Sequence, residues 1–334
     1  LYFVSTKGNF LKAKKVIASI IVFCLCILFG HNNSFAFWEG DMIYEGESVY
    51  NYLQVKDDET RAALSTNVLF GVQSVYMKSG ELSGLYYDYA MAAPLMADTG
   101  SQKKDILILG MGTGTYAKQC MKYFDNVSVE GVEIDSKITD LAHEYFDLPA
   151  ETKVTEYDGR AFLNVCQKKY DVIMVDAYQD ITIPFQMSSV EFFSLVKNCL
   201  KENGVMVVNM NMQSDSKDGI NSWLADTISS VFDNVYTIDV TGSSNRELFA
   251  SDNADMQSCL SASTDSITNN ELLYMMTDVC NNMTPYESGE HILTDDKAPV
   301  ELLGMKVIDG LIQSELSYYK EQFKEKGIKG LLEK

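Results

Sequence analysis

The feature that most constrains the fold of this chain is a glycine-rich turn between two short apolar runs. Residues 105–135 read DILILGMGTGTYAKQCMKYFDNVSVEGVEID, with Gly110, Gly112 and Gly114 in the turn. One apolar run precedes the glycines, and a helical pattern and a second apolar run follow them. The order of strand, glycine turn, helix and strand predicts a βαβ unit, which belongs in a parallel sheet.

The turn and the end of the second run together predict a nucleoside-binding site. Glycines let the backbone approach a ligand closely, and the helix start offers N–H groups without intrahelical partners. Glu133 ends the second run, 21 residues after Gly112, where a carboxylate can accept hydrogen bonds from two ribose hydroxyls. A dinucleotide fingerprint would need glycine at Thr115, so the pattern favours an S-adenosylmethionine-type ligand over NAD. A turn that only shapes the sheet is the alternative.

The rest of the chain repeats the alternation of strands and helices. Further strands are expected at residues 154–157, 170–178 and 205–209, each followed by a helical pattern. The run YDVIMVDAY at 170–178 is apolar on both faces, which is typical of a sheet covered on both sides. This order predicts an α/β fold with a doubly wound parallel sheet of the Rossmann-like type.

Three segments are expected along the chain. Residues 1–36 form a signal peptide or membrane anchor. Residues 37–85 contain short alternating runs and turns, which predict a small antiparallel β domain. Residues 86–334 form the Rossmann-like domain, which ends in an amphipathic helix at residues 300–323.

The first segment has the layout of a secretory signal peptide. It holds four lysines and no acid, and its apolar run of 14 residues precedes the small-x-small site Ser34-Phe35-Ala36. The run is short for a spanning helix, but an uncleaved anchor is the alternative. We expect the chain to be membrane-anchored or exported through this segment, with its bulk outside. The sequence begins with Leu1 and not with Met. If upstream sequence is missing, a location on the cytoplasmic face of the membrane stays open as an alternative.

The formal net charge of −20 argues against nucleic acid as a partner, because such partners are bound by basic surfaces. The same charge attracts cationic substrates, although solubility alone accounts for most of it. The seven cysteines form no C-x-x-C pair and have no His partner at metal-binding spacing. No metal site is therefore expected.

Several acids fall where parallel strands should end. Glu133, Asp158 and Asp176 each follow an expected strand, and Asp180 lies in the loop after Asp176. Ligands of open parallel sheets bind beyond these strand ends, so the acids should converge. Asp158 with Gly159 can receive an adenine amino group. Asp176 ends the most apolar strand and is the best candidate for a partly desolvated carboxylate, with a helix-capping or turn acid as the alternative.

These motifs resemble the spermidine synthase family of polyamine aminopropyltransferases, and most closely its membrane-associated members. The resemblance covers roughly residues 40–310 and rests on ILGMGTGT, GVEID, DGRAFL, YDVIMVDAY, IPFQMSSVEFFSLVKNCLKENGV, ESVYNYLQV and LTDDKAPVE, with Gln73 and Tyr86-Tyr87-Asp88. It implies transfer of an aminopropyl group from decarboxylated S-adenosylmethionine to a small cationic amine, a diamine such as putrescine. It also implies a homodimer.

The resemblance assigns roles to individual residues. Asp176 orients or deprotonates the attacking amine, which makes it the catalytic residue. Glu133 holds the ribose and Asp158 meets the adenine. The other cofactor-binding residues that it implies are Gln73, Gly110, Gly112, Thr113, Gly114 and Gly159. The amine-binding residues are Tyr86, Gln179 and Asp180.

Three departures from the family pattern keep two other functions open. Thr113 stands where the family has an Asp that binds the ammonium group of the decarboxylated cofactor and repels the carboxylate of ordinary S-adenosylmethionine. Gln179 replaces a second acid, although Asp180 is adjacent, and Tyr87-Asp88 replaces His-Glu. Thr113 favours a methyltransferase that uses intact S-adenosylmethionine. The lost acids and the expected export signal favour a non-catalytic, membrane-tethered ligand-binding domain.

Overall fold

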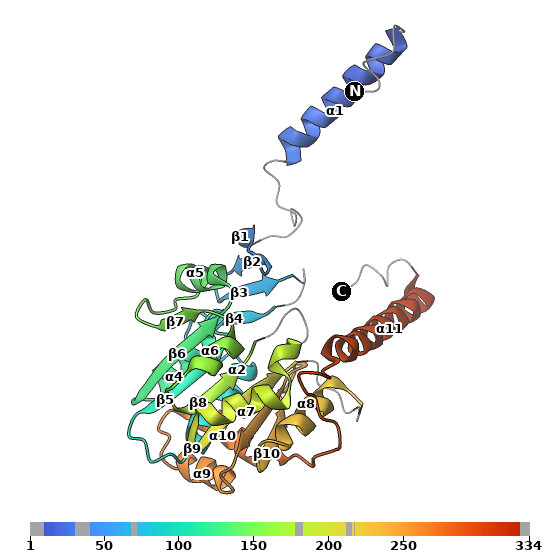
Figure 1. Cartoon of the computed structure of the whole chain (residues 1–334). Helices are drawn as coiled ribbons and strands as arrows, with labels where there is room; N and C mark the ends of the chain where they lie inside the picture. The colour runs from blue at the N-terminus through green and yellow to red at the C-terminus, as the bar shows by residue number, and fades with distance from the viewer. Residues whose placement is uncertain are drawn as a thin grey trace.

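The structure is a computed structural model that describes residues 10–30, 41–67, 72–177, 183–211, 216 and 218–327. A small sheet and a larger, helix-covered sheet form the body of the molecule (Figure 1). Helices α1 (Phe10–Gly30) and α11 (Val300–Lys326) project from this body.

The larger sheet has the strand order β12-β10-β11-β9-β8-β5-β6-β7 within the described residues. Its parallel part consists of β5 (Lys104–Leu109), β6 (Val127–Glu133), β7 (Lys153–Glu156), β8 (Tyr170–Val175) and β9 (Leu200–Met210). An antiparallel edge adds β10 (Asn234–Asp239), β11 (Arg246–Ser251) and β12 (Thr284–Pro285). The connection at residues 240–245 is too short for a parallel crossover, so β11 must reverse direction. The predicted Rossmann-like fold class is confirmed, with this antiparallel edge as an addition.

Helices cover both faces of the larger sheet. They are α2 (Tyr86–Ala90), α3 (Ala92–Met96), α4 (Thr115–Tyr123), α5 (Ser136–Tyr145), α6 (Gly159–Val165), α7 (Val190–Cys199), α8 (Ile220–Ser229), α9 (Met256–Thr264) and α10 (Asn270–Asn282), with a 3₁₀ turn at Phe185–Met187. Val207 of β9 packs in the cluster with α2, α3, α4, α9 and α10, and the next residue, Val208, packs with α6, α7 and α8. Both faces of β9 are thus buried, because neighbouring residues of a strand point to opposite sides.

The small sheet is antiparallel and packs on one helix of the larger unit. Its strands are β1 (Met42–Glu47), β2 (Tyr52–Asp57), β3 (Arg61–Thr66) and β4 (Ser74–Met77). Leu53 and Leu64 form a buried cluster with Leu141 of α5 and with Phe146. The sheet thereby lies beside α5, which follows β6. The exact division into segments 37–85 and 86–334 stays a prediction.

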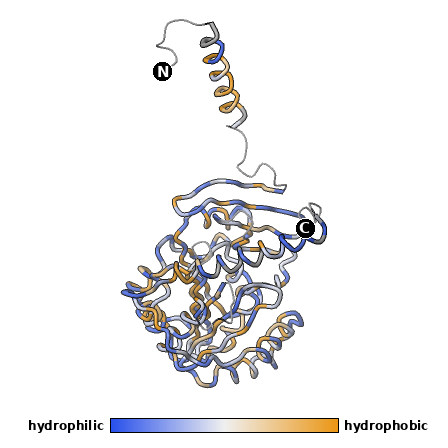
Figure 2. Tube along the Cα trace, turned by 90° about the vertical axis from the view of Figure 1, so that its right-hand side faces the viewer, coloured by the Kyte–Doolittle hydropathy of each residue, from blue (hydrophilic) through white to orange (hydrophobic). Residues whose placement is uncertain are grey.

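Helix α1 contains the apolar run that led us to expect a membrane anchor or an exported chain, and Figure 2 colours much of this helix as hydrophobic. Across the part of the chain that the structure describes, however, no helix is both long enough and apolar enough to cross a membrane. An apolar helix of about 14 residues is about 21 Å long, which is less than a hydrocarbon core of about 30 Å. The predicted localisation is therefore wrong.

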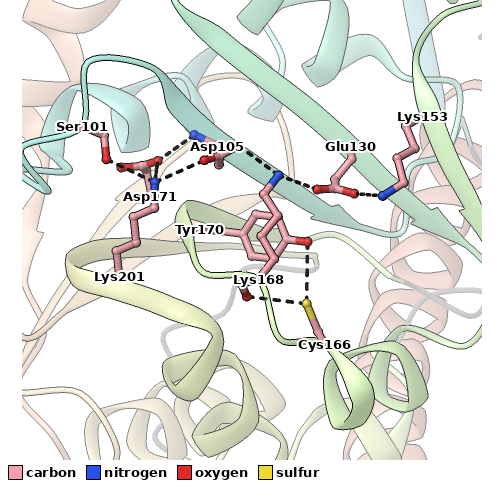
Figure 3. A network of polar contacts seen from close by, with 9 residues as sticks. All are labelled: Ser101, Asp105, Glu130, Lys153, Cys166, Lys168, Tyr170, Asp171 and Lys201. Atoms are coloured by element: carbon pink, nitrogen blue, oxygen red, sulfur yellow. Dashed lines mark hydrogen bonds and ion pairs between the residues drawn. The ribbon is translucent and has the colours of Figure 1, made fainter.

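A network of ion pairs joins the amino-terminal halves of the parallel strands (Figure 3). It connects the acids Asp105, Glu130 and Asp171 to Lys153, Lys168 and Lys201. Lys201 Nζ lies 2.7 Å from a carboxylate oxygen of the fully buried Asp171, and two lysines contact Glu130 at 2.6 and 2.7 Å. Burial raises the pKa of Asp171 and of Glu130, but hydrogen bonds from these lysines outweigh it and hold both pKa values below their ordinary range.

Candidate active site

A cavity of about 820 Å³ opens at the other end of the parallel strands, beyond their carboxyl ends. Gly110, Glu133 and Asp176, which follow or end β5, β6 and β8, line it together with residues of the small sheet and of α2. The cavity thus lies at the position where open parallel sheets bind ligands. Its volume is within the range of small-molecule sites, which is about 300–1,000 Å³.

The glycine turn brings the ends of β5 and β8 into direct contact. Gly110 has φ +85°, and a Cβ atom there would lie 2.5 Å from the carbonyl oxygen of Asp176. The Asp176 N–H also donates to the Leu109 carbonyl oxygen at 2.9 Å. A side chain at Gly110 would therefore push apart the two backbones that form the floor of the site.

Glu133 is held by the backbone at the position expected for a ribose-binding acid. Its two carboxylate oxygens accept from the N–H groups of Gly112 at 2.9 Å and of Asp135 at 3.1 Å. Burial raises the pKa of Glu133, while these backbone hydrogen bonds act in the opposite direction. The carboxylate is thereby fixed against the glycine turn before a ligand arrives.

Asp176 is surrounded by neutral hydrogen-bond donors. Tyr86 Oη donates to Oδ2 at 2.6 Å, and Asn209 Nδ2 donates to Oδ1 at 2.8 Å. Asn245 in turn donates to Asn209 Oδ1 at 2.7 Å. These partners are side chains, whereas a helix-capping acid would bond to backbone N–H groups. Burial raises the pKa of Asp176 to about 7, although the hydrogen bonds from Tyr86 and Asn209 lower it. Such a carboxyl can accept a proton near neutral pH.

Asp158 both caps helix α6 and lines the cavity. Its Oδ1 accepts from the Ala161 N–H at 2.7 Å and so caps α6, yet both Asp158 and Gly159 line the cavity. A Cβ at Gly159 would lie 3.3 Å from Met187 Cε, so a larger residue would crowd this part of the wall. The α6 cap therefore fixes the acid beside the expected adenine site.

The remaining candidates divide into three groups. Gln73 and Tyr86 line the cavity. Thr113 and Gly114 are not among its lining residues: Thr113 Oγ1 lies 2.6 Å from Ser74 Oγ in the interior, and Gly114 has φ +76° at the start of α4. Gln179 and Asp180 lie outside the described residues.

Sequence reasoning missed three residues beside Asp176. Asn209 ends an expected parallel strand, so the rule that was applied to the acids would have found it. Asn245 belongs to the turn before β11, and no sequence signal connects it to the site. Glu247 is an acid directly before the apolar residues Leu248, Phe249 and Ala250 of β11, in a buried part of the strand, which is an unusual position for a charge.

Comparisons with known proteins agree with this geometry. The family described as the spermine/spermidine synthase domain matches residues 85–241. A protein of Bifidobacterium longum (strain NCC 2705), described as a probable polyamine aminopropyl transferase, is 51% identical over 351 aligned residues, which cover 99% of this chain and 77% of that protein.

Two solved structures share the fold. The spermidine synthase of Thermotoga maritima has a TM-score of 0.56 at 18% identity, with 69% of this chain and 79% of that chain covered. A spermidine synthase in complex with the transition-state analogue AdoDATO has a TM-score of 0.57 at 18% identity, with 69% and 80% covered. The match to the Bifidobacterium longum protein along nearly the whole chain carries the classification, and this chain belongs to the spermidine synthase family of polyamine aminopropyltransferases.

Proposed function

We propose that the chain transfers the aminopropyl group of decarboxylated S-adenosylmethionine to a diamine such as putrescine. The observation that carries the proposal is Asp176, a half-buried carboxyl with a pKa of about 7 on the wall of a cavity that is also lined by Glu133. A base of this pKa suits removal of a proton from an ammonium group near neutral pH. Membership of a transferase family supports the same reaction.

The reaction needs little bond activation from the protein. Asp176 takes one proton from the acceptor ammonium, and the free amine nitrogen then forms a bond to the aminopropyl carbon attached to sulfur. That carbon–sulfur bond breaks, the sulfonium takes its electron pair, and methylthioadenosine leaves. Because the sulfonium is a good leaving group, the tasks left to the protein are proton removal and alignment of the two substrates.

In this proposal the residues of the two halves of the cavity perform these two tasks. On the nucleoside side, Glu133 accepts hydrogen bonds from the ribose hydroxyls in this proposal, and Asp158 meets the adenine amino group. Both residues line the cavity, which supports these roles. On the acceptor side, Tyr86 and Asn209 hold the two oxygens of Asp176 in one orientation. A carboxylate fixed in this way points its basic oxygen at one position of the amine, which favours in-line attack.

Calorimetric titration of the full chain tests the proposal. We expect methylthioadenosine and decarboxylated S-adenosylmethionine to bind, and a diamine to bind more tightly when methylthioadenosine is present. Product analysis should then show methylthioadenosine formed in equal amount to the lengthened amine. Tighter binding of intact S-adenosylmethionine, followed by methyl transfer, would replace this function with that of a methyltransferase. Failure to bind any of the three nucleosides would exclude both.

A further inference from the structure

Glu247 is a buried acid that the reaction above does not use. Its side chain is fully buried on β11, and neither carboxylate oxygen has a hydrogen-bond partner among the described residues. Burial of an unpaired carboxyl opposes folding, so such a group in a native structure needs a reason. An apolar residue of similar size would pack at this position without that penalty.

The position of Glu247 connects it to the acceptor side of the cavity. Glu247 is the cross-strand partner of Asn209 on β9, and Asn209 donates to Asp176. Cross-strand partners point to the same face of a sheet, here the face covered by α2 and α4. Glu247, Asn209 and Asp176 therefore form a row across β11, β9 and the end of β8.

The pKa shifts of Glu247 and Tyr116 also indicate that Glu247 lies near the cavity. Burial raises the pKa of Glu247 well above its ordinary value, and the charge of Asp176 adds to the shift. Burial also raises the pKa of Tyr116, with a smaller contribution from Glu247, and Tyr116 lines the cavity. Asp176 and Tyr116 are thus the titratable groups that interact with Glu247. Burial and the charge of Asp176 both favour the protonated form of the Glu247 carboxyl.

Among the residues that the structure describes, the wall of the cavity beyond Asp176 is otherwise neutral. The described residues that line this acceptor side after Asp176 are Asn209, Asn211, Ser243, Ser244 and Asn245. A diamine brings two ammonium groups, and Asp176 serves only the one that reacts. The second ammonium needs a negative charge nearby, because amide and hydroxyl groups do not replace the water that it loses on entering the cavity.

We propose that Glu247 is the counter-charge for the second ammonium group of the acceptor and makes the site select diamines over monoamines. The proposal rests on the proposed aminopropyl transfer. Glu247 lies behind Asn209 and not on the cavity wall, so it acts across that side chain as a positioning residue. When the second ammonium arrives, Glu247 releases its proton to solvent, and the resulting carboxylate attracts the cation through an interior of low dielectric constant.

A comparison of two amines with four carbons tests this role in the full chain. The amines are 1,4-diaminobutane and 1-aminobutane, which differ only in the second ammonium. We expect Glu247→Gln to lower kcat/KM for the diamine by about tenfold or more, mainly through KM. The kcat/KM for 1-aminobutane should change by less than about twofold, since this amine has no second ammonium group to interact with Glu247. Glu247→Met, which also removes the charge, should give the same pattern.

The control variant removes an acid that lies near Glu247 but away from the cavity. Asp239 is on the neighbouring strand β10, where it is exposed and pairs with Arg246. Asp239→Asn should leave kcat/KM for both amines unchanged. Thermal unfolding at pH 8 should show the Glu247 variants at least as stable as wild type, so that a loss of diamine use does not reflect misfolding.

Proton release gives a readout that a merely structural role would not affect. Calorimetry of diamine binding to the methylthioadenosine complex, in two buffers of different ionisation enthalpy, measures the protons released. At pH 7 wild type should release more protons than Glu247→Gln.

Two results would overturn the inference while leaving the proposed function intact. One is an equal loss for both amines in the Glu247 variants. The other is an unchanged preference for the diamine, in particular if Asp180→Asn abolishes it instead. Wild-type protein that uses neither amine would overturn the proposed function and this inference together.

Discussion

Asp171 and Asp176 lie at opposite ends of strand β8, and their surroundings differ in the charge of their partners. Asp171 is bonded to Lys201, to the Thr99 hydroxyl and to the Asp105 N–H. Asp176 is bonded to Tyr86 and Asn209, which are neutral. The pKa of Asp171 is accordingly below its ordinary value, while burial raises the pKa of Asp176 to about 7.

The same contrast extends to β6. Glu130, toward the amino end, contacts two lysines, whereas Glu133, at the carboxyl end, accepts hydrogen bonds from two backbone N–H groups. Lysine partners stabilise ionised acids and join neighbouring strands. Neutral partners keep an acid oriented but leave its charge uncompensated, so that a cationic substrate can supply the compensation. One end of the sheet therefore contributes to stability, and the other end is prepared for cations at some cost in stability.

The largest expected effect is on turnover, at the carboxyl end. Asp176→Asn removes the proton acceptor but preserves the shape of the side chain, so kcat should fall by about 10³-fold. Affinity for methylthioadenosine should stay near the wild-type value, because the proposed nucleoside contacts lie on the other side of the cavity. Steady-state kinetics and calorimetry measure the two quantities. A variant that keeps even a tenth of wild-type turnover would remove Asp176 from the role of base.

At the amino end the expected effect is on stability. Asp171→Asn leaves the Lys201 ammonium without its buried counter-charge, which should lower the free energy of unfolding by about 3 kcal/mol. The kcat of the folded variant should equal that of wild type, since Asp171 is not among the described residues that line the cavity. Urea unfolding and kinetics at pH 7 test both statements. Lys103→Met, at a surface position outside the network, is the control and should change neither.

The two ends should also respond to pH in opposite directions. The pKa of Asp176 rises from 3.8 to about 7 on folding, so the folded state binds more protons between these values and stability falls as pH rises toward 7. The pKa values of Asp171 and Glu130 are lowered by folding. Their contribution is therefore present above the ordinary pKa of an acid and is lost as pH falls through the lowered values. Unfolding curves should be recorded from pH 3 to pH 8. The free energy of unfolding of Asp176→Asn should exceed that of wild type by about 2 kcal/mol, and only at high pH.

The smallest expected effect concerns the partner of the base. The Tyr86 hydroxyl lowers the pKa of Asp176 by donating to it. The acidic limb of the profile of kcat/KM against pH is expected near pH 7 in wild type. Tyr86→Phe should therefore move this limb to higher pH by about half a pH unit. A shift toward lower pH would mean that the hydroxyl does not stabilise the ionised form. Tyr89→Phe is a matched control on the same helix, and it should leave the limb in place.

Much of the carboxyl end could be predicted from the sequence. Glu133, Asp158 and Asp176 each follow an expected strand, and in a parallel sheet the carboxyl ends of the strands meet at one edge. Gly110 was predictable for a similar reason, because a glycine directly after a strand indicates a sharp turn. These inferences depend only on the direction of strands and on the period of the pattern.

The residues that escaped prediction depend on tertiary register or orientation. Glu247 meets Asn209 because β11 reverses after a short turn and pairs antiparallel with β9, and no periodicity specifies that register. Thr113 belongs to the glycine turn, yet its hydroxyl bonds to Ser74 of β4 and it does not line the cavity. The lysines of the amino-end network come from β7, from β9 and from the connection before β8, so their convergence follows from the folded sheet. Dimerisation is not tested by these data and stays a prediction.

One paired measurement addresses the division between the two ends most directly. It compares methylthioadenosine formation from decarboxylated S-adenosylmethionine and putrescine with the free energy of unfolding, both at pH 8, for wild type, Asp176→Asn and Asp171→Asn. The account predicts that Asp176→Asn forms almost no product and is more stable than wild type, while Asp171→Asn is fully active and less stable. An Asp176→Asn variant that is active, or one that is inactive only because it is less stable than wild type, would contradict it.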